Sequence, residues 1–303
     1  MASINNWVLL SAYVLSFIIG VPANILAFYA FVMKVRQKPT PTDILLLNLT
    51  SSDLLFLCFL PLKMYEAASN MEWHLPKIMC SITSFIFFTT IYTSALLLMA
   101  VSVDRYVAVA YPVLYRQLYK PIYAIAVSAF AWFFSAAHCT IVFFVVHLPL
   151  PNNTVRSTAC YEQFTEEQKK IVLPVRLEFF IVLCLVPLLI SVLCYLRCIW
   201  LLYTQPRISK EKKRRAIGMA MGTLFVFVVC FLPYSSSHVV GYSSNKSPEW
   251  RYYTLLLSTF NTCLDPIIFY FSSSVYRNTS ALHMPCLRQR NCSRDEVVDG
   301  SSD

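Results

Sequence analysis

The sequence of residues 84–106 is SFIFFTTIYTSALLLMAVSVDRY, an apolar and hydroxyl-bearing stretch that ends in the charged pair Asp104 and Arg105. No Asp, Glu, Lys, Arg or His precedes Asp104 within it. About 20 residues of this kind, wound as a helix, cross the hydrocarbon core of a bilayer. The stretch is therefore predicted to be a membrane-spanning helix, with Asp104, Arg105 and Tyr106 at the point where it leaves the membrane.

The composition of the whole chain agrees with this local feature. Of 303 residues, 57% are hydrophobic and 14% are charged, and the mean hydropathy is +0.57. Soluble domains carry about 25% charged residues, so the composition excludes an ordinary cytosolic enzyme, a disordered regulator, a collagen and a nucleic-acid binder. A membrane hydrolase is not expected either, because the 5 His residues are dispersed and no HExxH motif occurs. We expect an all-α membrane protein that is not an enzyme.

Apolar runs long enough to cross a membrane recur along the chain. The predicted spans are residues 7–32, 43–68, 77–109, 121–146, 171–203, 212–241 and 249–272. They make residues 1–273 a seven-transmembrane helix bundle, and residues 274–303 a tail. No internal repeat is visible, which argues against an inverted-repeat transporter. A small-anion transporter is nevertheless the alternative from a different functional class.

The distribution of basic residues predicts the orientation of the bundle. Of the 25 Lys and Arg residues, 16 lie on one side of the spans and 8 on the other, with Arg105 at a span end. The richer side is cytoplasmic under the positive-inside rule. We therefore expect an extracellular N-terminus and a cytoplasmic C-terminus. The net charge of +9 is an orientation signal and attracts anionic membrane lipid, not nucleic acid.

A middle layer of polar residues lies where ionisable groups are costly, inside the predicted spans. Two carboxylates in hydrocarbon repel each other unless a proton or a cation joins them, and oxygen ligands suit a hard cation such as sodium. We expect a sodium ion here, and no other cofactor. The alternative is a set of hydrogen bonds that only join the helices. The residues expected around the ion are Asp53, Ser94, Asn261 and Asp265.

An outer layer of cationic groups lies near the ends of the last three predicted spans. It consists of Arg176, His238 and Arg251, and three such groups at one end of a bundle favour an anionic ligand. Arg176 could instead pair with Glu178, but residues two apart do not share a helix face. The sequence therefore predicts an anion-binding pocket at the outer end.

Several motifs recur in the order and spacing of a known family: Cys80, DRY at 104–106, Trp132, Pro187, Tyr195, CFLPY at 230–234 and DPIIFY at 265–270. The chain resembles the rhodopsin-like (class A) G-protein-coupled receptors over its whole length. The resemblance implies a plasma-membrane receptor with a Cys80–Cys160 disulfide and a cytoplasmic cleft for a G protein. The residues implied in activation and coupling are Asp104, Arg105, Tyr106, Tyr195, Phe231, Pro233, Asp265 and Tyr270. Phe231 stands where the family usually has Trp, and Asp265 where it usually has Asn.

A closer resemblance rests on VLPVRLE, CYE at 160–162, PYSSSHVVGY, KSPEWR and LDPIIFYFSSS. These segments are similar to those of the free fatty acid receptors, specifically the short-chain receptors 2 and 3. The resemblance implies a receptor for acetate, propionate and butyrate, with a hydroxycarboxylate or other small organic anion as the alternative ligand. The implied ligand-binding residues are Arg176, Arg251, His238, Tyr234, Tyr92, His138, Glu162 and Phe88. Phe88 is Tyr in one of the two receptors and Phe in the other, so the preferred acyl length stays open.

Partners and modifications complete the expectation. Heterotrimeric G proteins of the Gi or Gq type and arrestin are the expected protein partners. Asn152 begins an Asn-Asn-Thr glycosylation sequon in the predicted second outer loop. In the tail, residues 271–284 resemble an amphipathic membrane-surface helix, and Cys286 or Cys292 is a candidate for palmitoylation.

Overall fold

The computed structural model describes residues 6–118, 120–147, 160–161, 164–204 and 210–272. Every secondary-structure element within these ranges is helical. The elements are α1 (Asn6–Gln37), α2 (Pro41–Ala68), α3 (Lys77–Ala110), α4 (Pro112–Leu118), α5 (Pro121–Cys139), α6 (Ile141–His147), α7 (Glu166–Phe179), η1 (Phe180–Leu185), α8 (Val186–Thr204), α9 (Lys210–Phe225), η2 (Val226–Phe231), α10 (Leu232–Ser244) and α11 (Arg251–Ser272).

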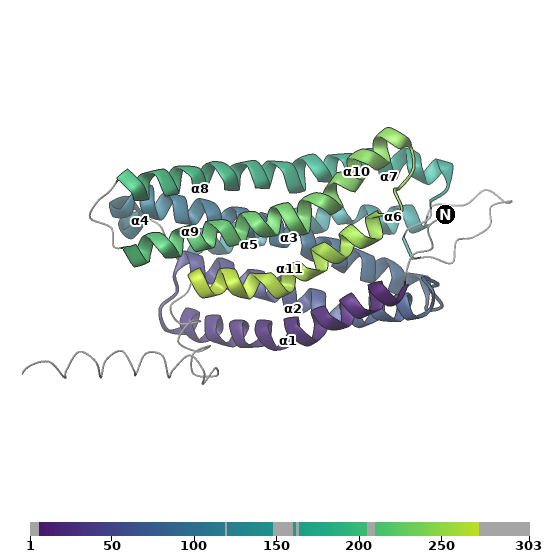
Figure 1. Ribbon diagram of the computed structural model, residues 1–303, viewed down its shortest axis with the longest axis horizontal. Coiled ribbons are helices and arrows are strands. Elements are labelled where there is room, and N and C mark those ends of the chain that lie inside the picture. Colours follow the sequence, from purple (N-terminus) through teal and green to yellow (C-terminus); the bar gives the residue numbers. More distant parts are fainter. Residues whose placement is uncertain (1–5, 119, 148–159, 162–163, 205–209, 273–303) are drawn as a thin grey trace, which may run out of the picture.

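These elements form long rods that run side by side along the molecule (Figure 1). Six rods in the described chain are long and apolar enough to cross a membrane: α1, α2, α3, α5 with α6, α7 through α8, and α9 through α10. The helix α11, with 22 residues, is about 33 Å long at 1.5 Å per residue and so is also long enough. Each predicted span therefore falls on a helix, and the expectation of an all-helical membrane fold is confirmed.

The outer surface is apolar and the polar side chains are turned inward. Of the apolar part of α3, 83% is buried, more than in any of the other five rods just named, so α3 runs through the centre of the bundle. On the outside, Phe130, Phe133 and Trp200 are more than half exposed. An apolar surface of this extent is what a lipid bilayer covers, and the chain is a multi-pass membrane protein.

Two rods contain wide, π-helical turns that the sequence did not predict. The segment η1 ends two residues before Pro187, and η2 ends two residues before Pro233. Proline has no N–H to donate, and its ring clashes with the carbonyl four residues earlier. A π-helical turn contains one residue more than an α-helical turn, so the helix can continue past the proline. Ser258 of α11 donates a hydrogen bond to the Cys230 carbonyl inside η2 at 2.8 Å, which satisfies one backbone group at this irregularity.

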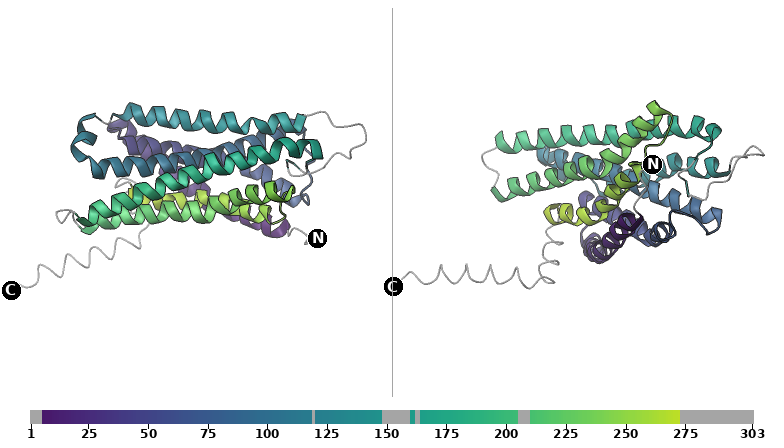
Figure 2. Two further views of the ribbon diagram at one scale, coloured as in Figure 1. Left: turned by 90° about the horizontal axis from the view of Figure 1, so that it is seen from above. Right: turned by 45° about the vertical axis from the view of Figure 1, so that its right-hand side comes forward.

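The connection at residues 111–120 differs from its expected loop structure, because Pro112–Leu118 forms the short helix α4. The predicted span 121–146 is likewise divided at Thr140 into α5 and α6. In Figure 1, α4 and the start of α9 lie at one end of the bundle, while α6, α7 and α10 lie at the other. Figure 2 shows the same two ends from further directions. We call the second one the disulfide end, because it contains the Cys80–Cys160 bond, with an S–S distance of 2.04 Å.

Local capping fixes where α7 enters the disulfide end. The Thr165 hydroxyl accepts from the Gln168 backbone N–H at 3.3 Å, and the Gln168 side chain accepts from the Thr165 N–H at 3.0 Å. This reciprocal pair is a capping box. The Gln168 amide also donates to the Val145 carbonyl at 2.9 Å, so the start of α7 is attached to α6.

Candidate functional site

A cavity lies inside the disulfide end, between α3, α6, α7, α10 and α11. The empty space between its lining atoms, including the part that is open to solvent, is about 310 Å³. Its polar lining consists of Tyr92, Tyr161, Arg176, Tyr234, His238 and Arg251. Its apolar lining consists of Phe88, Ile141, Val142, Val172, Val175 and Phe179. No Asp or Glu is among the described residues that line it, so the cavity has a positive electrostatic character.

Arg251 is the first residue of α11 and is buried in the cavity wall, with 2% of its surface exposed. Its Nη2 donates a hydrogen bond to the Tyr234 hydroxyl at 2.8 Å, and its guanidinium lies 5.2 Å from the centre of the same ring. A guanidinium can bind a planar anion such as a carboxylate through two parallel N–H groups.

His238 lies one turn beyond Tyr234 on α10, and the two rings meet edge to face at 4.9 Å. Its Nε2 is 3.2 Å from the Tyr92 hydroxyl of α3. Its Nδ1 is buried and has no hydrogen-bond partner among the described residues. A buried ring nitrogen left in this way is available to a ligand.

Arg176 approaches the cavity from α7 and is held near its mouth. Its Nη1 donates to the Ser247 hydroxyl at 3.0 Å, in the connection between α10 and α11. Its guanidinium also lies 4.9 Å from the Phe164 ring centre and 5.7 Å from that of Tyr161. Arg176 does not pair with Glu178, whose carboxylate is instead 3.1 Å from His138 Nε2. This agrees with the expectation that residues two apart on a helix face different directions.

The structure therefore brings together around one cavity six of the eight residues that the family resemblance implies for the ligand site: Phe88, Tyr92, Arg176, Tyr234, His238 and Arg251. His138 is not among the described lining residues. Its Nε2 lies 3.1 Å from the Glu178 carboxylate, and its ring is tilted against that of Phe134, with centres 4.2 Å apart. Its ring centre lies 6.1 Å from that of the lining residue Phe179, and its contact with a ligand stays a prediction. Glu162 and the glycosylation candidate Asn152 lie outside the described residues.

Tyr161 forms part of the wall that closes the cavity, which we call its roof, and it was not predicted from the sequence. Tyr161 follows Cys160, has a left-handed backbone (φ 58°) and is buried against Phe88, with ring centres 5.6 Å apart. Burial raises the pKa of Tyr161 to about 12, so its phenol keeps its proton at physiological pH. Its place directly after the predicted disulfide cysteine was the signal that could have identified it.

The middle polar layer surrounds a second, smaller space of about 170 Å³ that Asp53, Ser94 and Asn261 help to line. Asp265 is fully buried in α11. Its carboxylate lies next to the side chains of Asp53 and Asn261. With both carboxylates ionised, neither Asp265 oxygen has a hydrogen-bond donor among the described residues, and the same is true of Asp53 Oδ2 and Asn261 Oδ1. Buried oxygens of this kind fit a hard cation. Ser94 already donates to the Ser52 hydroxyl at 3.2 Å, so its oxygen retains acceptor capacity.

At the opposite end, the Asp104 carboxylate is held by hydroxyl groups. Thr42 of α2 and Tyr115 of α4 both donate to it, the latter at 2.9 Å. In the described chain no ion pair joins Asp104 to its neighbour Arg105. Burial raises the pKa of Tyr115, and the nearby Asp104 carboxylate raises it further.

The other residues expected in activation lie on α3, α8, η2, α10 and α11. The Tyr195 hydroxyl is 3.1 Å from that of Thr223, which links α8 to α9. Phe231 is the last residue of η2 and is buried, with its ring 5.6 Å from Phe227, and Pro233 is the second residue of α10. Tyr106, at the end of α3, lies edge to face with Tyr111. The side chain of Tyr270 lies outside the described set.

Comparison with known proteins gives consistent results over nearly the whole chain. Residues 23–269 match the family described as 7 transmembrane receptor (rhodopsin family). The chain is 47% identical to free fatty acid receptor 3 of Mus musculus over 274 residues, which cover 90% of this chain and 85% of the relative. It is 46% identical to free fatty acid receptor 2 of Homo sapiens over 289 residues, which cover 94% and 87%. Free fatty acid receptor 2 of Mus musculus is 48% identical over 272 residues, with coverage of 89% and 82%.

Proposed function

The chain belongs to the free fatty acid receptors, within the rhodopsin family of seven-transmembrane receptors, and on that premise we propose that it senses short-chain fatty acids. Acetate, propionate and butyrate are the proposed ligands, and the cavity at the disulfide end is their proposed site. The observation that carries the proposal is the convergence of Arg176, His238 and Arg251, from three helices, on one cavity without an acidic lining residue among those described.

The contacts of the ligand follow from the geometry of these groups. A carboxylate placed between the two guanidiniums would accept charge-assisted hydrogen bonds from both Arg176 and Arg251. Tyr234 and His238 line the same cavity and would serve as further hydrogen-bonding groups. The short acyl chain would then lie against Ile141, Val142 and Val175. Bridging by one anion would offset the repulsion between the cations and draw the ends of α7, α10 and α11 together.

The size of the ligand sets an upper limit on affinity. Acetate and propionate have only about four to five non-hydrogen atoms, and the best very small ligands gain about 1.5 kcal/mol per atom. The ceiling of about 6 to 7 kcal/mol corresponds to a Kd no tighter than about 10 to 100 μM. A receptor built on this site works at high micromolar to millimolar ligand concentrations.

In this proposal the disulfide end faces the outside of the cell. Disulfides persist in oxidising compartments, and 16 of the 25 Lys and Arg residues belong to the opposite side. A heterotrimeric G protein of the Gi or Gq type, and arrestin after it, would bind at the cytoplasmic end. Asp104, Arg105, Tyr115 and the Tyr195–Thr223 pair are the groups there that would change partners on activation.

We also propose that a sodium ion binds in the middle layer and that Asp53 and Asp265 hold it, with Asn261 and Ser94 as neutral ligands. The ion would supply the positive charge that two buried carboxylates need. Support comes from the buried carboxylate oxygens that lack hydrogen-bond partners in the described chain.

The test is a concentration–response measurement of cAMP and calcium in cells that express the chain. The panel consists of straight-chain carboxylates from C1 to C8, hydroxycarboxylates and dicarboxylates. Responses confined to C2–C4 acids support the proposal, and stronger responses to hydroxycarboxylates favour the alternative ligand class. Uptake of labelled acetate without any G-protein signal would identify a transporter and contradict the proposal.

A further inference from the structure

A buried ion pair lies at the disulfide end of α2, next to the disulfide and apart from the residues that line the cavity. Lys63 Nζ is 2.8 Å from Glu66 Oε2, and the two side chains are 10% and 1% exposed. Burying two charges is costly, and a pair of this kind often contributes no more stability than apolar residues would. Its presence at this position calls for a function beyond the stability of α2.

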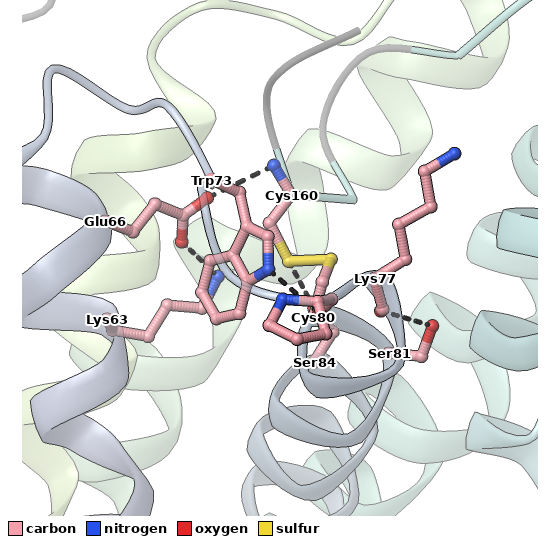
Figure 3. The surroundings of a disulfide bond; sticks show 9 residues. Lys63, Glu66, Trp73, Lys77, Cys80, Ser81, Ser84 and Cys160 are labelled. Carbon is pink, nitrogen blue, oxygen red and sulfur yellow. Dashed lines mark hydrogen bonds and ion pairs between the residues drawn. A yellow bond between two sulfur atoms is a disulfide. The ribbon is translucent and has the colours of Figure 1, made fainter. Parts of the chain in front are cut away.

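The second carboxylate oxygen of Glu66 makes a contact across the fold. Glu66 Oε1 accepts a hydrogen bond from the backbone N–H of Cys160 at 3.3 Å, as Figure 3 shows. The Cys160 sulfur is bonded to Cys80 and lies 3.5 Å from the Ser84 hydroxyl. The disulfide therefore fixes the sulfur of Cys160, while Glu66 fixes its peptide group.

The orientation of the peptide matters because the next residue closes the cavity. Tyr161 has a left-handed backbone, which a residue with a Cβ adopts only at a cost. Its ring lies between Phe88 of α3 and the guanidinium of Arg176, 5.6 Å from the one ring centre and 5.7 Å from the guanidinium carbon. A peptide free to rotate at Cys160 would relax this backbone and move the Tyr161 ring away from both neighbours.

We propose that Glu66 is a positioning residue for the ligand cavity: its carboxylate holds the Cys160 peptide so that Tyr161 closes the roof between Phe88 and Arg176. Lys63 neutralises the Glu66 charge and keeps the carboxylate pointed at Cys160. The inference rests on the proposed function, since it assigns the roof of the same site. It predicts that the roof, and with it the preference for short acids, depends on an acceptor at position 66.

Two double variants separate this role from simple stabilisation of α2. Lys63→Met with Glu66→Gln removes both charges but keeps an amide oxygen that can accept from Cys160. Lys63→Met with Glu66→Leu is equally uncharged and has no acceptor. The two proteins therefore differ in the hydrogen bond to Cys160, while neither contains an uncompensated buried charge. If the Leu variant does not reach the cell surface, Lys63→Met with Glu66→Thr replaces it, because this variant is also uncharged and the Thr hydroxyl is too short to reach the Cys160 nitrogen.

Two measurements are made at matched surface expression. The first is hydrogen exchange of the Cys160 amide in purified receptor, which needs no ligand. We expect the variant without an acceptor to exchange about tenfold faster than wild type, with the Gln variant close to wild type. The second is the potency of valerate relative to propionate, which we expect to rise about tenfold in the variant without an acceptor and to stay within about threefold in the Gln variant.

Each outcome is decisive. Equal exchange and equal potency ratios in the two double variants would overturn the proposal, as would a changed ratio with unchanged exchange, because Glu66 would then act by another route. Faster exchange in a receptor whose wild type responds to no carboxylate would leave the Cys160 contact established and contradict the proposed ligand instead.

Discussion

Arg176 reaches across the mouth of the cavity to Ser247, with 3.0 Å between Nη1 and the hydroxyl oxygen. The two residues belong to α7 and to the connection between α10 and α11, so this bond joins two elements that the chain itself does not connect there. A carboxylate that binds Arg176 competes with Ser247 for the same N–H groups.

Replacement of Ser247 by Ala should therefore raise the potency of propionate. A neutral hydrogen bond contributes about 0.5–1.5 kcal/mol, so the gain should be about 2- to 10-fold in a concentration–response assay. Ser244→Ala is the matched control, because its hydroxyl bonds only to backbone carbonyls among the described residues and lies at the exposed end of α10. A fall in potency in Ser247→Ala would show that Ser247 positions Arg176 for the ligand.

Replacement of either Arg176 or Arg251 by Ala should abolish the response to short acids while the receptor still reaches the surface. Loss of one charged hydrogen bond costs about 1.5–3 kcal/mol, a large share of the ceiling for so small a ligand. Lys246→Ala removes an exposed positive charge from the same end and should have no such effect. Unchanged potency in either Arg variant would place the carboxylate elsewhere.

Ile141 should limit the length of the acyl chain, because it lines the cavity from α6. Ile141→Ala opens space at the apolar wall, so the potency of valerate and hexanoate should rise relative to acetate by about 5-fold or more. The same change at Ile122, which is 58% exposed on α5, should leave the ratio unaltered. A parallel shift of all acids in Ile141→Ala would argue against contact with the chain.

Sodium should lower agonist potency through Asp53. When NaCl is replaced by choline chloride, wild-type potency should rise, and Asp53→Asn should remove this dependence because an amide cannot supply the charge that holds the ion. Glu249→Gln, an exposed acid at the disulfide end, serves as the control. Identical salt dependence in wild type and Asp53→Asn would contradict a sodium site there.

Loss of the Tyr115 hydroxyl should raise signalling in the absence of ligand. Tyr115 donates to the Asp104 carboxylate and holds α4 against the end of α3, so Tyr115→Phe removes one contact that keeps this end closed. We expect basal G-protein activity about twofold or more above wild type at equal surface expression. Tyr29→Phe, at an exposed position on α1, should behave as wild type.

The positions of the outer cations could be predicted from the sequence, because helix geometry fixes the depth of a residue in the membrane and the direction of its side chain. Arg176, His238 and Arg251 lie near the ends of spans whose lengths a bilayer dictates, and the separation of Arg176 from Glu178 follows from the helical period. The direction of the His138 side chain could not be predicted in the same way, because its contact with Glu178 joins α5 to α7 and no local pattern encodes that contact.

The role of Lys63 and Glu66 was equally hidden. In the sequence they form an ordinary pair three residues apart at a helix end, the kind that usually lies in solvent. Their third partner, Cys160, is far away along the chain, and only the tertiary fold brings its peptide group to Glu66.

The wide turn η1 changes the direction in which side chains on its two sides point. Arg176 and Tyr195 are 19 positions apart, and at about 100° per residue an unbroken α-helix would point them about 100° away from each other. The one additional residue in the wide turn removes about the same angle, so both side chains face the interior, 5% and 1% exposed. A helical wheel drawn straight through residues 176–195 therefore assigns one of them to lipid. Deletion of a single residue from 180–185 would therefore rotate the half of the helix that contains Arg176 relative to the half that contains Tyr195. It would shorten the helix only slightly.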